Sequence, residues 1–140
     1  MKNQAIRVLT MLSLVLVFCA AAANAQSLSR RINVPFSFSV GQQTLAAGEY
    51  TLEPVRRDSR NMWLLQNRDT GKSAIFTTNE VRSLQSAATT KVIFSKYNGE
   101  YFLAQIWSAG DNSGREVKPS RHERQLAQQA GKPEHLSINN

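Results

Sequence analysis

The sequence predicts a mainly β fold, an antiparallel β-sandwich or open barrel of about six strands with one short C-terminal helix. Three observations lead to this class. Apolar and polar residues alternate along residues 32–40. Asn98-Gly99 separates two strand-like runs, which is a strong hairpin signal. Ser120 and Glu123 have the spacing of a helix-capping box. We expect one β-rich domain over residues 26–131.

The segment before this domain, residues 1–25, has the layout of a cleavable signal peptide. Lys2 and Arg7 precede an apolar run over residues 8–22, and Ala23-Asn24-Ala25 offers small residues immediately before the cut. This pattern predicts an exported bacterial protein, periplasmic or extracellular. No transmembrane anchor is expected after cleavage.

Two alternatives to cleavage are a retained anchor and a lipoprotein. The apolar run of 15 residues is shorter than the roughly 20 that a spanning helix needs. A lipoprotein would be cut before Cys19, but the bulky Phe18 stands where a small residue is required. Cleavage as a secreted protein is therefore favoured over both.

Cleavage would also change the composition. It removes Cys19, the only cysteine, so the mature chain would contain no disulfide and no thiol nucleophile. Because Lys2 and Arg7 are removed as well, the formal net charge falls from +7 to +5. A basic exported domain suits anionic envelope polymers, lipid head groups or acidic proteins as partners. Export argues against nucleic acid.

The first predicted strand covers residues 32–40, where alternate side chains form one apolar face. Pro35 cannot donate a backbone hydrogen bond, which indicates an edge strand or a bulge. A second short strand is predicted over residues 49–53, ended by Pro54.

Two further strands are predicted in the middle of the chain. Residues 62–65 form a short apolar run, which is typical of a strand covered on both faces. Residues 69–72 contain Gly71 and predict a turn. The chain should return as a strand over residues 73–78, and residues 79–89 are expected to form a loop.

The hairpin around Asn98-Gly99 is the clearest structural signal. A two-residue turn would pair Tyr97 with Glu100 and Phe94 with Leu103. On that register both faces are apolar, so the hairpin should be central and covered on two sides. One face would carry Val92, Phe94, Tyr101 and Leu103, and the other Ile93, Tyr97, Phe102 and Ile106.

The C-terminal part follows a loop over residues 109–114. The capping box predicts a helix over residues 121–130, and Gly131 is a natural helix stop. This helix is short, so it must dock on the domain to be stable. Residues 132–140 are predicted to be a disordered tail.

Several of these segments resemble a family of small, uncharacterised exported β-rich proteins from acidobacteria-like genomes. Residues 32–41 are similar to its opening motif, I-P-F-x-F-x-V-G, and residues 45–50 to its L-P-A-G-x-Y turn, with Ala46 in place of the proline. Residues 101–107 and 120–124 resemble its later segments. The resemblance implies export and a β-rich fold. The family has no assigned activity, so no site is carried over.

Residues with the spacing of a catalytic, cofactor or metal site are not found in the sequence. The mature chain has two histidines, His122 and His135, too far apart for a compact ligand set. Residues 111–114 lack the spaced acidic ligands of a calcium loop, and no serine lies in a Gly-x-Ser-x-Gly elbow. We predict no catalytic, metal or cofactor-binding residues and no cofactor.

Basic residues remain as the candidate functional feature, weighed against an ordinary solvated surface. Two groups could form an anion-binding surface. They are Arg56, Arg57 and Arg60 in one group, and Arg115, Lys118, Arg121 and Arg124 in the other.

The leading functional hypothesis is a non-enzymatic exported β-domain that acts in the envelope by binding or as a structural component. One alternative is a small hydrolase with two carboxyl groups within roughly 5–10 Å in a concave pocket. The other is a carbohydrate-binding module, which requires exposed aromatic side chains, with Trp63 and Trp107 as the best candidates.

Overall fold

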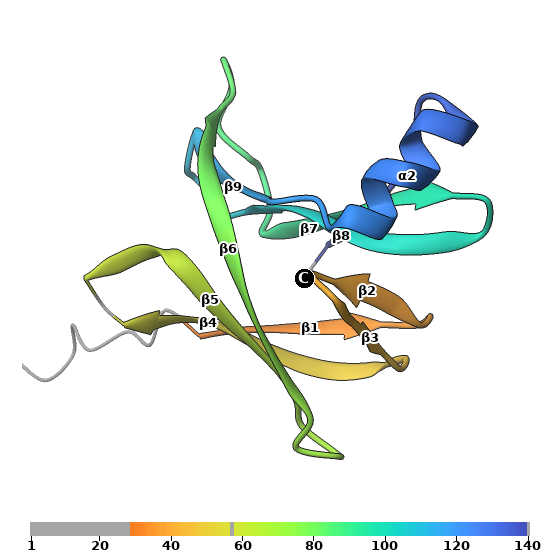
Figure 1. Cartoon of the computed structure of the whole chain (residues 1–140). Coiled ribbons are helices and arrows are strands. Elements are labelled where there is room, and N and C mark those ends of the chain that lie inside the picture. The colour runs from red at the N-terminus through yellow and green to blue at the C-terminus, as the bar shows by residue number, and fades with distance from the viewer. Residues whose placement is uncertain (1–28, 57, 140) are drawn as a thin grey trace, which may run out of the picture.

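The computed structural model describes residues 29–56 and 58–139, and shows a mainly β protein with one short C-terminal helix (Figure 1). Ten strands are hydrogen-bonded into one mixed, open sheet. The predicted class is confirmed at this level, but the expected number of strands is too low and one pairing is parallel. The predicted signal peptide lies outside the described residues.

The elements in chain order have the following bounds. They are β1 (Arg30–Val34), β2 (Phe38–Val40), β3 (Gln43–Leu45), β4 (Gly48–Arg56), β5 (Ser59–Asn67), β6 (Ser73–Arg82), β7 (Lys91–Tyr97), β8 (Glu100–Trp107), β9 (Ser113–Val117), α2 (Arg121–Ala130) and β10 (Glu134–Asn139).

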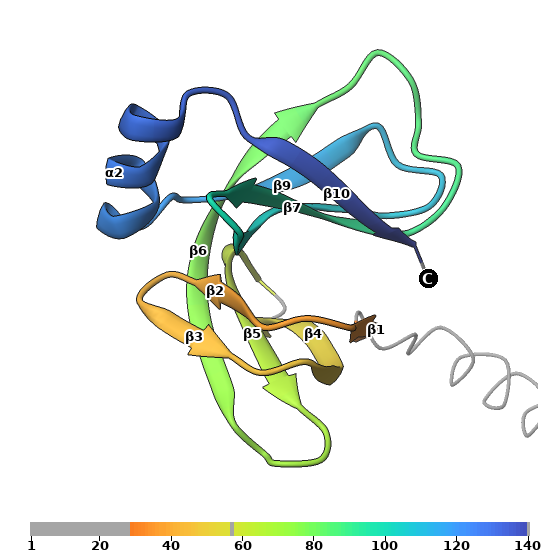
Figure 2. The same cartoon turned by 90° about the vertical axis from the view of Figure 1, so that its right-hand side faces the viewer.

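The sheet folds into two layers because the long strand β6 belongs to both (Figures 1 and 2). Residues 73–77 of β6 pair with β5, in the layer that continues to β4 and β1. Residues 78–82 pair with β9, in the layer that continues to β8, β7 and β10. The β2–β3 hairpin joins the second layer through a parallel contact of Ser39 with Phe102.

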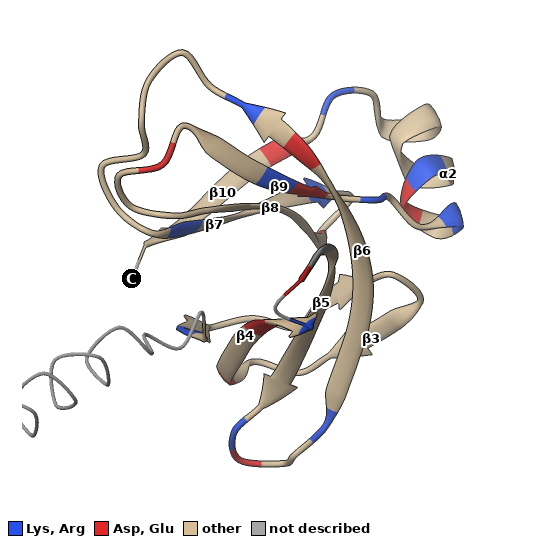
Figure 3. Ribbon diagram, turned by 90° about the vertical axis from the view of Figure 1, so that its left-hand side faces the viewer, with Lys and Arg blue, Asp and Glu red and all other residues tan. Residues whose placement is uncertain are grey.

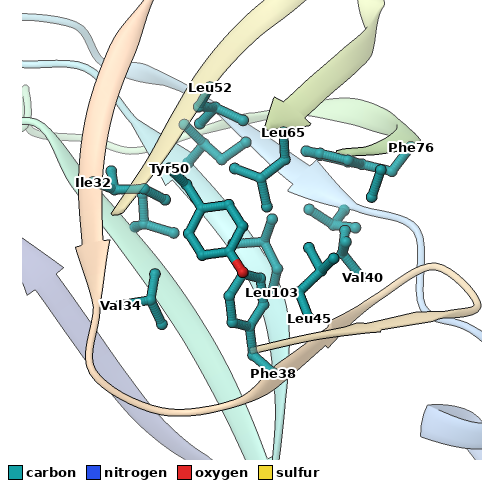
Figure 4. Close-up of a cluster of buried hydrophobic side chains, with 14 of the residues drawn as sticks. Ile32, Val34, Phe38, Val40, Leu45, Tyr50, Leu52, Leu65, Phe76 and Leu103 are labelled. Carbon is teal, nitrogen blue, oxygen red and sulfur yellow. The ribbon is translucent and has the colours of Figure 1, made fainter. Parts of the chain in front are cut away.

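The core lies between the layers and is built from alternate residues of the strands (Figure 4). Ile32, Val34, Phe38 and Val40 are all buried, which confirms the alternation predicted for the first segment. The chain turns at residues 35–37, however, so this segment forms two strands instead of one. β1 is an edge strand, as the proline indicated.

The β7–β8 hairpin has the predicted register at its turn, with Tyr97 opposite Glu100 and Phe94 opposite Leu103. It is central, because β8 pairs with β7 on one side and with β9 and β2 on the other. A bulge between Ile93 and Phe94 shifts the register beyond it. As a result Ile106 lies opposite Val92 and joins the main core, not the face predicted for it.

Gly114 of β9 is required by close packing in the second layer. A Cβ atom built at this position would lie 2.7 Å from ring carbons of Trp107, closer than real Cβ contacts. Gly114 lies opposite Trp107 on β8 and opposite Val81 on β6. The missing side chain therefore lets the indole ring cover β9.

Three strands were not predicted because they are short and mostly polar: β3, β9 and β10. The largest correction concerns the tail. Residues 132–140 were predicted to be disordered, but Glu134–Asn139 pairs antiparallel with β7. Ile138 packs against the core, and Lys96 forms an ion pair with Glu134 at 3.1 Å.

Two middle strands also differ from the prediction. β4 continues through Pro54, which lies beyond the Arg30–Leu52 end of the β1 ladder, where no described residue pairs with that edge of β4. β5 is covered on one face only, since Trp63 and Leu65 are buried while Met62 is 41% exposed.

Candidate anion-binding groove

A groove opens where β9 leaves the sheet. The Lys118 backbone N–H donates the last bond of this ladder, to the Thr77 carbonyl at 3.2 Å. Pro119 follows, and it has no N–H with which to continue the ladder. Ser120 then caps α2, its hydroxyl accepting from the Glu123 N–H at 3.1 Å. The chain therefore turns away from β6, whose residues 73–77 extend beyond the end of β9.

The space left beside β6 is a groove of about 490 Å³. One wall is β6, with Ile75 and Thr77. The opposite wall is the β2–β3 turn, with Gln42 and Gln43, and the buried side chains of Val40 and Phe76 also line the groove. Its third side is the start of α2 and the connection before it, which carry Lys118, Arg121 and Arg124.

The groove is cationic. Figure 3 shows the basic segments of the connection and the first turns of α2 gathered beside β6. None of the described residues that line the groove is Asp or Glu. Within the described ranges, no carboxylate lies within 4.0 Å of the Lys118, Arg121 or Arg124 charge. The Arg124 guanidinium donates to the Pro119 carbonyl at 3.1 Å, which holds it across the start of the helix.

A second groove, of about 460 Å³, lies between α2 and the β2–β3 hairpin. It shares Gly41, Gln42, Ser120 and Arg121 with the first, so the two grooves meet at the contact between the turn and the helix. Its further lining is Ser39, Thr44, Phe102, His122 and Gln125. His122 Nε2 lies 2.9 Å from Glu100 Oε2, so a carboxylate lies beside one residue of this second groove.

The helix start is anchored by a buried carboxyl group. Glu123 is 8% exposed, and this burial raises the pKa of its carboxyl group, against the opposing effect of the Ser120 backbone N–H. Tyr97 is also buried, and desolvation together with nearby Glu123 raises its pKa. The predicted capping box is therefore present, and it sets the first turn of α2, which carries Arg121.

The structure divides the predicted basic residues into two sets. Lys118, Arg121 and Arg124 come together in the groove. Arg115 does not join them, because its guanidinium lies 3.8 Å from Glu80 and its side chain is 15% exposed.

The other predicted group lies elsewhere on the molecule. Arg56 is at the end of β4 and forms an exposed ion pair with Asp58 at 3.4 Å. Arg57 and the side chain of Arg60 lie outside the described part of the chain.

Two observations bear on the alternatives to a binding domain. Neither groove has an Asp or Glu among its described lining residues, whereas a carboxylate-pair hydrolase needs two. Trp63 and Trp107 are 6% and 9% exposed, so neither offers a platform for a sugar ring. The residues described contain no group of three or more His, Cys, Asp or Glu side chains suited to a metal. Among the same residues, no helix has the length and hydropathy to cross a bilayer.

Of the residues that line the groove, sequence reasoning named only Lys118, Arg121 and Arg124 as site residues. It missed those on β6 and the β2–β3 turn, among them Ile75, Thr77, Gln42 and Gln43. Ile75 alone carries a signal, as a large apolar side chain that is 59% exposed. Comparisons with protein-family models, with curated proteins and with solved structures find no match for this chain.

Proposed function

We propose that this protein is a non-enzymatic, exported β-domain that binds anionic ligands in the groove between β6, the β2–β3 turn and α2. Export is supported by the signal-peptide pattern of residues 1–25 and by the resemblance to small exported proteins. The ligands would be anionic polymers of the cell envelope or acidic proteins.

One observation carries the proposal. Lys118, Arg121 and Arg124 line one groove, and none of its described lining residues carries a carboxylate. Of the ten other Lys and Arg side chains that the structure describes, five form an ion pair with an acidic side chain, as Arg68 does with Glu49 at 2.9 Å and Arg82 with Glu80 at 3.1 Å. Unpaired cations that line one groove create a positive potential there, which favours the binding of anions.

Binding of two soluble polyanions, polyglutamate and polygalacturonate, tests the proposal. We expect the full chain to bind at least one of them at low ionic strength, and to lose affinity as salt is added. Replacing Lys118, Arg121 and Arg124 together by Ser should reduce the affinity at least tenfold.

The matched control replaces Arg31, Arg56 and Lys132 by Ser. This variant loses the same charge, but none of these residues lines either groove. We expect it to keep its affinity within about threefold, an effect of net charge alone. Equal losses in the two variants would refute a groove-specific site, as would the absence of polyanion binding at low salt.

A further inference from the structure

We propose that the ligand in this groove is an extended acidic peptide segment, bound as an added strand on the free edge of β6. The inference rests on the proposed anion-binding function and names the partner class. Strand addition of this kind gives affinity through main-chain hydrogen bonds and specificity through side-chain pockets.

The backbone of β6 presents hydrogen-bonding groups to the groove. The Thr77 carbonyl points toward the β9 side, since it accepts from the Lys118 N–H. Backbone groups alternate sides along a strand, so the N–H and C=O of Ile75 point the same way, toward the groove and away from β5. Among the described residues, no strand pairs with this edge of residues 73–76, next to the Thr77 carbonyl that Lys118 occupies.

The dimensions of the edge suit a short segment. Residues 75–77 of β6 line the groove, and the strand continues without a described partner on this edge back to Ser73; at a rise of about 3.4 Å per residue, residues 73–76 offer roughly 14 Å of edge. Ile75, the exposed apolar residue of the groove lining, can pack against an apolar side chain of the segment. The glutamines of the β2–β3 turn can hydrogen-bond to its outer edge.

The charges favour an acidic segment and set its position. Lys118, Arg121 and Arg124 stand at the end of the groove where β9 stops, so acidic residues belong at the corresponding end of the peptide. A polysaccharide would satisfy the cations but would not use the Ile75 backbone groups or the apolar lining. Basic residues near an edge can also prevent strand pairing, and that alternative predicts no peptide binding.

An array of hexapeptides tests the proposal with the full chain. Two Glu residues occupy one terminus of each peptide, the other four positions vary, and peptides ending in two Lys serve as controls. The best binder is resynthesised with N-methyl groups on odd residues and, separately, on even residues. In an added strand, the N–H groups of alternate peptide residues point toward β6 and donate to it, while those of the other residues point away. We expect one version to lose affinity at least tenfold and the other to bind within about threefold of the parent.

Two results would overturn the inference: no Glu-ending peptide exceeding the Lys-ending controls, or equal binding of both methylated versions and the parent. If polyglutamate or polygalacturonate binding still depends on Lys118, Arg121 and Arg124 in that case, only the strand-addition mode fails. A polyanion affinity that is unchanged in the triple variant would instead remove the proposed function.

Discussion

The two halves of β6 have the same strand geometry but different electrostatic surroundings. Residues 78–82 lie against β9, where Glu80 forms ion pairs with Arg82 at 3.1 Å and Arg115 at 3.8 Å. Residues 73–77 extend past the end of β9, and residues 75–77 line a groove whose described lining holds three cations and no carboxylate. Cations beside the half of β6 that pairs with β9 therefore form ion pairs, whereas the cations beside the other half do not.

This difference separates cations that the fold holds in ion pairs from cations that stay exposed. Arg115 is mostly covered, and a covered charge needs a partner to offset its lost hydration. Exposed cations such as Arg121 and Lys118 remain hydrated, so the fold does not require a carboxylate beside them. These cations line one groove and are therefore available to bind a ligand.

The largest effect is expected from two neighbouring residues in the first half of β6. Phe76 is 5% exposed in the core, whereas Ile75 is 59% exposed on the opposite face. Phe76→Ala should destabilise the protein by about 3–5 kcal/mol through lost burial and a cavity. Ile75→Ala should cost less than about 1 kcal/mol. Urea unfolding measures both, and equal costs would contradict the described orientation of β6.

A smaller effect should follow from breaking the charge balance in the second half. Glu80→Gln leaves Arg115 without its carboxylate, and we expect a loss of about 0.5–1 kcal/mol because Glu80 is 39% exposed and its ion pairs are screened. The control Glu116→Gln removes an exposed charge with no ion pair among those described. An identical change of unfolding free energy in both variants would show that the Glu80 pairs contribute nothing.

The smallest effect concerns the capping box that sets the first turn of α2. Burial raises the pKa of Glu123 above its ordinary value of 4.5, so ionisation costs more in the folded state than in the unfolded state. The stability that the protein gains from protonated Glu123 is fully present below the pKa of this group in the unfolded state. It is lost as the pH rises through the pKa of the group in the folded state. Glu123→Gln should therefore be slightly more stable than the wild type at about pH 7, with the difference vanishing below about pH 4.

Thermal unfolding of both proteins across this pH range provides the measurement. A variant less stable than the wild type at neutral pH would show that attraction of the carboxylate to the helix N-terminus outweighs its desolvation.

Local patterns in the sequence were sufficient for the elements with strong alternation or turn chemistry. The Asn98-Gly99 turn set the hairpin register near it, and Ser120 with Glu123 set the helix start. They failed for β3, β9 and β10, whose residues are mostly polar and whose pairing depends on distant strands. The bulge between Ile93 and Phe94 was likewise not predicted.

The candidate site was predicted in composition but not in arrangement. Lys118, Arg121 and Arg124 were named from sequence because they are close along the chain. Arg115 was named with them for the same reason, yet it lies beside Glu80. That separation depends on the β6–β9 pairing, in which Arg115 lies opposite Glu80, and the sequence alone does not specify this register.

The most direct test of the central claim is to locate bound polyglutamate by NMR. Titration of the full chain should shift the backbone amide signals of Gln42, Ile75, Thr77 and Arg121, and leave those of Arg82 and Arg115 unchanged. Added salt should reverse the shifts. Shifts centred on Arg82 and Arg115, or spread evenly over the exposed cations, would contradict the assignment of the groove beside the first half of β6 as the binding site.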